Sequence, residues 1–213
     1  MNNAQSDALV FFGATGDLAY KKIFPSLQAL IKRGHLNVPV VGVAKADWTL
    51  EQLRARAQDS LEKHGGLDRA AFEKLSGLLH YVAGDYKDLA TFAAIRKELG
   101  SAQRPAHYLA IPPVLFGTVV EQLGKSGCSK SARVIIEKPF GTDLGSAREL
   151  NRILLGAFDE KTIFRIDHYL GKAPVHNMVF FRFTNGLLEP VFHLLVRFDG
   201  GMQGPMPLRV LHD

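Results

Sequence analysis

Short apolar runs alternate with stretches of helical periodicity along most of this chain. The runs are rich in Val, Ile, Leu and Phe and have the length of single buried strands. They fall at residues 9–12, 38–43, 79–82, 107–111, 134–136 and 163–166. Continuous apolar runs of this kind are typical of strands covered on both faces. The alternation therefore predicts an α/β fold in which crossover helices connect the strands of a parallel sheet.

Three of the helical stretches show where they begin, end or break. Thr49 and Gln52 have the spacing of a capping box, and the helix that follows them should stop at Gly65. Residues 89–99 predict a second helix, ended by Gly100. Within residues 17–33, Pro25 removes an amide donor, so this helix should be kinked or split near residue 24. Its expected buried face is Ile23, Phe24, Leu27, Leu30 and Ile31.

Composition narrows the classes of protein to consider. There are 26 basic and 21 acidic residues, a formal net charge of +5, but the charges are interleaved, which favours a small anionic ligand over a nucleic acid. The single Cys128 excludes an internal disulfide, and no His or Cys spacing predicts a metal site. No basic N-terminal region and no long apolar stretch is present, so we expect a cytoplasmic protein with no membrane partner.

A glycine turn, GATGDLA at residues 13–19, joins the first predicted strand to the first helical stretch. Gly13 and Gly16 would allow a sharp turn close to a pyrophosphate, and the following helix N-terminus favours its negative charge. The small Ala19 would allow close packing of helix and strand. The alternative is a purely structural turn. With a strand before it and a helix after it, the turn predicts a dinucleotide site on a Rossmann-like doubly wound sheet.

The residue after the second predicted strand bears on the choice of coenzyme. An acidic residue there would bind the ribose 2′-hydroxyl of NAD, whereas this chain has Lys45, a cation suited to the 2′-phosphate of NADP. We therefore predict NADP. Asp47, two residues later, keeps NAD open, and the alternative interpretation of Lys45 is a solvated loop lysine.

A dense group of polar side chains follows the last predicted strand. Arg165, Asp167, His168, Tyr169 and Lys172 fall within eight residues. Since ligands bind at the carboxyl edge of parallel sheets, the His, Tyr and Lys donors could hold a phosphate. The structural alternative is that Tyr169 packs into the core, Arg165 pairs with Asp167 and His168 is a satisfied donor.

Four segments, taken together and in this order, resemble glucose-6-phosphate dehydrogenase. They are GATGDLAYKKIFP at 13–25, YLAIPP at 108–113, EKPFG at 137–141 and RIDHYLGK at 165–172. The last is the most discriminating, whereas the EKP motif also occurs in other sugar dehydrogenases with this coenzyme fold. The similarity runs from about residue 9 to about residue 190.

The resemblance implies oxidation of glucose 6-phosphate at C1 to 6-phosphogluconolactone with hydride transfer to NADP, the first step of the pentose phosphate pathway. It assigns His168, Tyr169 and Lys172 to the substrate phosphate and Asp167 to the active site. Lys138 would contact both substrate and coenzyme, next to a cis proline at Pro139. The implied coenzyme residues are Gly13, Ala14, Thr15, Gly16, Asp17, Leu18, Ala19, Lys21, Lys45, Asp85 and Lys138.

Departures from the family pattern occur at two coenzyme positions and in the last part of the chain. The family usually has Arg at position 45 and Lys or Arg at position 20, so Lys45 and Tyr20 predict weaker NADP binding or a shift toward NAD. The family's catalytic base is a histidine in a downstream Asn-His-Leu segment, which these 213 residues do not contain. His193 echoes that segment only faintly, since Phe192 replaces the asparagine.

We therefore expect a truncated or frame-shifted product. Residues 1–172 would form the NADP-binding domain, and residues 173–213 the start of a second, α+β domain. The sheet through which the family forms homo-oligomers would be missing. Two functional readings stay open: a family enzyme with little or no turnover, and a non-catalytic NADP-binding module.

Overall fold

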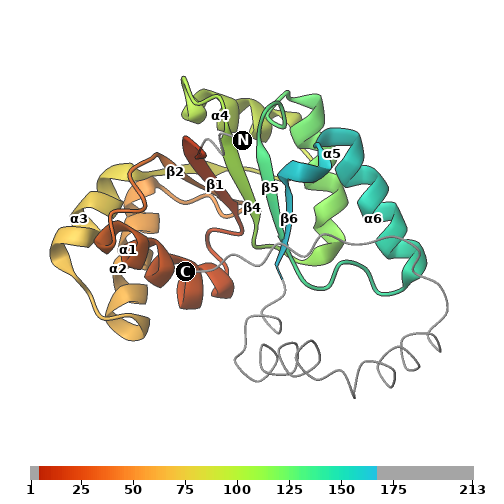
Figure 1. The fold of residues 1–213 in the computed structure, drawn as a ribbon. Coiled ribbons are helices and arrows are strands. Elements are labelled where there is room, and N and C mark those ends of the chain that lie inside the picture. Colours follow the sequence, from red (N-terminus) through yellow and green to blue (C-terminus); the bar gives the residue numbers. More distant parts are fainter. Residues whose placement is uncertain (1–4, 167–213) are drawn as a thin grey trace, which may run out of the picture. The chain divides into compact units, whose positions relative to one another are not determined.

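Within residues 5–166, which a computed structural model of the chain describes, six strands form a single parallel sheet (Figure 1). The strands are β1 (Ala8–Phe12), β2 (Val40–Ala44), β3 (Leu79–Ala83), β4 (Pro105–Leu109), β5 (Arg133–Glu137) and β6 (Ile163–Ile166). Their order is β3-β2-β1-β4-β5-β6, and every neighbouring pair is parallel. This is the strand order of the Rossmann fold. The predicted α/β class and doubly wound sheet are confirmed.

Two strands differ from the prediction by two residues at an end. β2 begins at Val40 rather than residue 38, because Pro39 has no amide to donate to the ladder. β4 covers Pro105–Leu109 rather than 107–111. Its carboxyl end is set by the turn that follows, where Ala110 approaches the glycine turn and Pro112 and Pro113 cannot continue the ladder.

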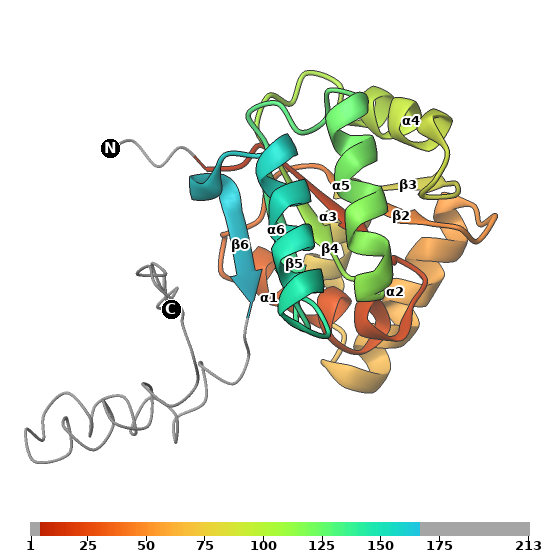
Figure 2. The same ribbon diagram turned by 90° about the vertical axis from the view of Figure 1, so that its right-hand side faces the viewer.

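Helices cover both faces of the sheet (Figures 1 and 2). One face carries α1 (Phe24–Lys32), α2 (Leu50–His64) and α3 (Arg69–Leu78), and the other carries α4 (Leu89–Leu99), α5 (Phe116–Lys125) and α6 (Leu144–Ala157). Short turns of helix complete the chain: η1 (Ala19–Ile23), η2 (Pro113–Leu115) and η3 (Glu160–Thr162). Alternate residues of β1 enter the two cores, Phe11 on the α1 side and Phe12 on the α5 side.

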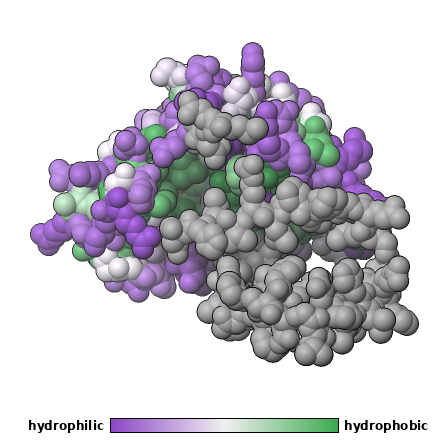
Figure 3. Space-filling view, in the orientation of Figure 1, coloured by the Kyte–Doolittle hydropathy of each residue, from purple (hydrophilic) through white to green (hydrophobic). Residues whose placement is uncertain are grey.

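Local sequence signals set several helix ends as predicted. Thr49 Oγ1 accepts from the Gln52 amide at 3.3 Å, and Gln52 Oε1 accepts from the Thr49 amide at 2.8 Å, so the capping box is confirmed. Helix α2 ends at Gly65 and α4 at Gly100, whose φ of 53° lies in the left-handed region. The outer surfaces of the helices are hydrophilic, and apolar residues reach the surface in a hollow between them (Figure 3).

The first helical stretch is split, as predicted from Pro25, into the π-helical turn η1 and helix α1. Its buried face differs by one residue. Leu30 is exposed, and Gln28 is buried in its place. The Gln28 amide donates to the Gly66 carbonyl at 2.9 Å and accepts from the Asp68 amide at 3.0 Å. These two bonds satisfy the buried amide and turn the helix toward the α2–α3 connection.

The predicted boundary at Lys172 and the predicted second domain lie outside the described residues. The chain divides into one unit that ends at Ile166 and another that begins at Asp167, so the described fold is that of the first unit. Among residues 5–166, no helix combines the length and the hydropathy that a membrane span requires.

Candidate coenzyme site

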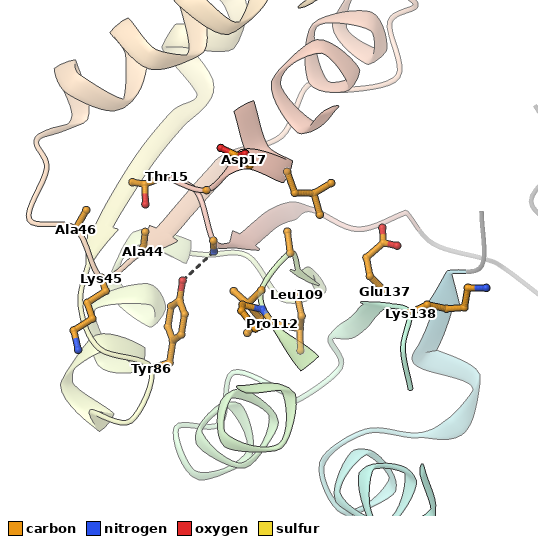
Figure 4. A pocket seen from close by; sticks show the side chains of 15 residues that line it. Thr15, Asp17, Ala44, Lys45, Ala46, Tyr86, Leu109, Pro112, Glu137 and Lys138 are labelled. Atoms are coloured by element: carbon orange, nitrogen blue, oxygen red, sulfur yellow. Dashed lines mark hydrogen bonds between the residues drawn. The ribbon is translucent and has the colours of Figure 1, made fainter. Parts of the chain in front are cut away.

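A pocket of about 500 Å³ opens at the carboxyl ends of the strands, where the strand order reverses between β1 and β4. This is the place where open α/β sheets bind their ligands. The lining comes from the carboxyl ends of the strands and the loops that follow them: Gly13 and residues 15–18 after β1, 44–46 at the end of β2, Tyr86 after β3, 109–112 at the end of β4, and 137–138 at the end of β5 (Figure 4).

Gly13 is required by the shape of the turn. Its φ is +84°, and a Cβ built on it would lie 2.2 Å from the Ala110 carbonyl oxygen. Its amide donates to the Val43 carbonyl at 2.9 Å and to the Tyr86 hydroxyl at 3.0 Å. The turn is therefore fixed against β2, β4 and the loop after β3, so its backbone is held in place for close approach by a ligand.

Tyr86 is a pocket residue that was not predicted from the sequence. Its hydroxyl donates to the Val43 carbonyl at 3.2 Å, and its ring packs edge-on against Phe12 with centroids 5.7 Å apart. Burial raises the pKa of its phenol. The only signal in the sequence was its place directly after Asp85, near the end of the third strand.

The remaining residues of the glycine turn divide into packing and lining positions. Ala14 and Ala19 are fully buried, and Ala14 packs against Gly42, where a Cβ would lie 2.9 Å from the Ala14 methyl. Thr15, Gly16, Asp17 and Leu18 line the pocket. The helical segment starts at Asp17, so first-turn amides and the helix dipole face the pocket edge and suit a pyrophosphate.

At the β2 end of the pocket, two residues predicted separately form one ion pair. Lys45 Nζ lies 3.0 Å from Asp85 Oδ2, and the Lys45 side chain is 80% exposed. The amide of Lys87 and then Lys45 lower the pKa of Asp85. Such an exposed pair contributes little stability, so Lys45 can exchange Asp85 for a phosphate. Lys45 lines the pocket and Asp47 does not.

Lys21, another predicted coenzyme residue, also has a carboxylate partner. Its Nζ lies 2.9 Å from Asp17 Oδ2 on the exposed side of the first turn. The hydrogen bond from Lys21 holds the pKa of Asp17 below its ordinary value. Asp17 lines the pocket, and Lys21 reaches it only through this pair.

At the β5 end, the YLAIPP and EKPFG segments meet. The Tyr108 hydroxyl donates to Glu137 Oε1 at 2.6 Å, and burial together with this bond raises the pKa of the phenol. The Lys138–Pro139 peptide bond is cis, as the resemblance implied. Lys138 lies at the end of the pocket opposite to Lys45 (Figure 4).

The predicted active-site residue Asp167 and the predicted phosphate residues His168, Tyr169 and Lys172 lie outside the described residues. Strand β6 pairs with β5 as far as Ile166, which lies opposite Glu137. The described part of the chain therefore ends next to the strand end that is followed by Lys138. Arg165 forms an ion pair with Glu160 at 2.9 Å and hydrogen bonds to Asn151.

These residues fit a dinucleotide. The glycine turn permits close approach, the helix start favours a pyrophosphate, and apolar residues 109–112 give a surface for flat rings. Lys45 directly follows β2 and Lys138 directly follows β5, and these two strands are separated by three strand spacings, about 14 Å. Within residues 5–166, no cluster of three His, Cys, Asp or Glu could hold a metal ion.

Comparison with known proteins identifies the family of this chain. The sequence model of the family described as "Glucose-6-phosphate dehydrogenase, NAD binding domain" matches residues 10–177. Glucose-6-phosphate 1-dehydrogenase 1 of Mycobacterium bovis is 43% identical over 187 residues, 88% of this chain and 40% of the relative. The glucose-6-phosphate 1-dehydrogenase of Rhizobium meliloti is 37% identical over 192 residues, 86% of this chain and 39% of the relative.

Solved structures show the same likeness. The crystal structure of glucose-6-phosphate 1-dehydrogenase from Mycobacterium avium matches with a TM-score of 0.77 and 43% identity, over 88% of this chain and 41% of that one. A glucose-6-phosphate dehydrogenase in complex with its substrate glucose-6-phosphate matches with a TM-score of 0.72 and 36% identity, over 88% and 42%.

The matching family model is described as an NAD binding domain, and the chain spans about two fifths of the length of these relatives. The match supports the predicted coenzyme, NADP. The fold and the family match lead to the same conclusion. This chain belongs to the glucose-6-phosphate dehydrogenase family.

Proposed function

We propose that this chain is the NADP-binding part of an oxidoreductase that converts glucose 6-phosphate to 6-phosphogluconolactone. One observation supports this above all: a single pocket at the sheet's switch point, built around Gly13, has Lys45 at one end and Lys138 at the other. The first cation suits the 2′-phosphate of the coenzyme, and the second stands where the reacting ring and the substrate would meet. One similar solved structure is described as bound to glucose-6-phosphate.

In the proposed reaction, the coenzyme supplies the acceptor of a hydride from C1 of the sugar. The C1 hydroxyl loses its proton to a base as the C1–O bond becomes the lactone carbonyl. The residues described here do the binding and orientation. Gly13 and the helix start at Asp17 would fix the pyrophosphate, and Lys138, next to a cis proline, would reach coenzyme and substrate together.

The substrate phosphate would be held by three residues that follow β6. We propose His168, Tyr169 and Lys172 for this role, because they belong to the family motif RIDHYLGK and follow closely in sequence on Ile166, the last residue of β6. Asp167 would lie in the active site.

We further propose that the 213 residues bind NADP but turn over little or no substrate by themselves, because they include no Asn-His-Leu segment to supply the base. The second candidate, a non-catalytic NADP-binding module, is favoured by the same observation. The proposed partner is glucose 6-phosphate, with neither nucleic acid nor membrane, in the cytoplasm. Homo-oligomers are expected where the family's dimerising sheet is present.

Two measurements on the purified chain test these proposals. Titration with NADP by calorimetry should show saturable binding, and absence of binding would refute both candidates. Turnover of glucose 6-phosphate is then followed by the absorbance of NADPH. Both candidates predict little or no turnover, in contrast to a complete enzyme. Turnover comparable with a typical enzyme, about 10 per second, would refute the proposed lack of a base.

A further inference from the structure

Beside the coenzyme pocket, an arginine of α2 lies over two aromatic rings. The guanidinium carbon of Arg56 is 4.6 Å from the centroid of the Tyr20 ring and 5.7 Å from that of Trp48. Tyr20 belongs to η1, just after the glycine turn, and Trp48 follows the loop of Lys45 and Ala46. The cation is thus held between the two segments that border the β2 end of the pocket.

The Tyr20 ring is itself held in place. Its hydroxyl donates to Asp59, one helical turn beyond Arg56 on α2, and Lys63 pairs with the same carboxylate at 2.9 Å. Its ring packs edge-on against His64 with centroids 5.1 Å apart. Tyr20 is therefore fixed to α2 by both its ring and its hydroxyl, which gives Arg56 a rigid surface.

The donors of Arg56 are still available for a ligand. A guanidinium that stacks through its face keeps its N–H groups in the plane, at the edge. The Nε atom of Arg56 is buried and has no hydrogen-bond partner among the described residues, although buried donors are nearly always paired. The charge of Arg56 also reaches the pocket. The hydrogen bond from Lys21 has the largest effect in lowering the pKa of Asp17, which lines the pocket, and the positive charge of Arg56 lowers it further.

We propose that Arg56 is a specificity residue for NADP, whose guanidinium, fixed by Tyr20 and Trp48, binds the coenzyme 2′-phosphate together with Lys45. This rests on the proposed NADP binding and deepens it. Figure 4 shows Thr15 and Asp17 on one side of this end of the pocket and Lys45 and Ala46 on the other. Arg56 does not itself line the pocket, but it lies over Trp48, two residues after the pocket-lining Ala46, and over Tyr20, three residues after the pocket-lining Asp17.

Arg56→Gln tests the proposal, with calorimetric titration of NADP and of NAD. The expected result is a loss of NADP affinity of about tenfold, as for one charge-assisted hydrogen bond, with NAD affinity unchanged. Arg54→Gln is the matched control, because it removes the same charge from the same helix but faces the Ser76 carbonyl, 3.0 Å from its Nε. Arg54→Gln should leave the NADP-to-NAD ratio unchanged. Arg56→Lys, which keeps the charge but loses the planar fork, should fall between.

Fluorescence gives a second readout, because Trp48 is the only tryptophan of the chain. Adding 2′,5′-ADP should change Trp48 emission in the wild type more than adding 5′-AMP does, and this difference should disappear in Arg56→Gln. If Arg56→Gln leaves both coenzyme affinities unchanged, or lowers them equally, the role of Arg56 is refuted while NADP binding stands. If the wild type binds neither coenzyme, the proposed function fails as well.

Discussion

The two sides of the β2 end of the coenzyme pocket are built in different ways. The glycine turn is fixed by backbone and buried contacts, with Gly13 against Ala110 and bonded to Val43 and Tyr86. The cationic side consists of side chains at the surface, with Lys45 in an exposed ion pair. A change on the first side should therefore reduce the stability of the fold, whereas we expect a change on the second side to alter the choice of coenzyme while the fold is kept.

The largest expected effect is that of Gly13→Ala. The new methyl must move away from the Ala110 carbonyl while the backbone keeps a φ of +84°, which should cost about 3 kcal/mol of unfolding free energy. Binding of NADP and NAD should fall together. Urea unfolding and calorimetry measure the two effects.

Gly34→Ala is the control for backbone strain alone. Its φ is +74°, and a Cβ there meets nothing within 4 Å, so we expect a loss of about 1 kcal/mol and no change in coenzyme binding. Equal losses for the two variants would show that close contact with Ala110 does not matter.

The buried core should respond to pH through one histidine. His107 is fully buried on β4, its Nε2 donates to the Cys128 carbonyl at 2.8 Å, and burial lowers its pKa to about 4. The unfolded chain binds a proton at its ordinary pKa near 6.5, so stability should be complete above that pH and fall between pH 6.5 and 4. The loss should reach at most about 3 kcal/mol.

Urea unfolding at pH 7, 5.5 and 4.5 measures this dependence, with His107→Asn as the variant that does not titrate. The difference in unfolding free energy between wild type and variant should shrink as the pH falls. A constant difference would mean that His107 is not the group responsible.

Lys45→Gln should separate coenzyme choice from stability. We expect NADP affinity to fall about tenfold, NAD affinity to stay the same, and unfolding free energy to change by less than about 0.5 kcal/mol. Lys97→Gln, on the exposed surface of α4, removes the same charge away from the pocket and should change neither affinity. If Lys45→Asp left the preference between NADP and NAD unchanged, the assignment of Lys45 would be wrong.

Tyr86→Phe should have the smallest effect. It removes the hydroxyl that accepts from the Gly13 amide and donates to the Val43 carbonyl, while both groups keep the bond to each other. We expect a loss of about 1 kcal/mol in unfolding free energy and a weaker, equal loss of affinity for both coenzymes. Thermal unfolding and calorimetry measure these two losses. A loss of affinity for NADP alone would show that Tyr86 acts on the choice of coenzyme rather than by holding the glycine turn.

The glycine turn of the pocket and several helix ends were predictable from sequence, because each depends on residues that are close together in the chain. Gly13 needs a positive φ, Pro25 splits a helix, and Thr49 with Gln52 caps one, each within a few neighbouring residues. The alternation of apolar runs predicted the sheet for the same reason, because each strand is buried on both faces.

The side-chain-built part was not predictable, since it depends on pairs far apart in the chain. Tyr86 bonds to Gly13 across 73 residues, Lys45 to Asp85 across 40, and Arg56 lies over Tyr20. The same holds for Gln28, which displaced Leu30 from the buried face through bonds to the α2–α3 connection. Residue spacing predicts which face an element buries, but not which distant side chains meet there.

The central claim is that this pocket binds NADP in preference to NAD. Calorimetric titration of the wild-type chain with each coenzyme, at one ionic strength, tests it most directly. We expect saturable binding of one NADP per chain, with an affinity at least about tenfold higher than for NAD. Equal affinity for the two coenzymes, or no binding of NADP, would contradict it.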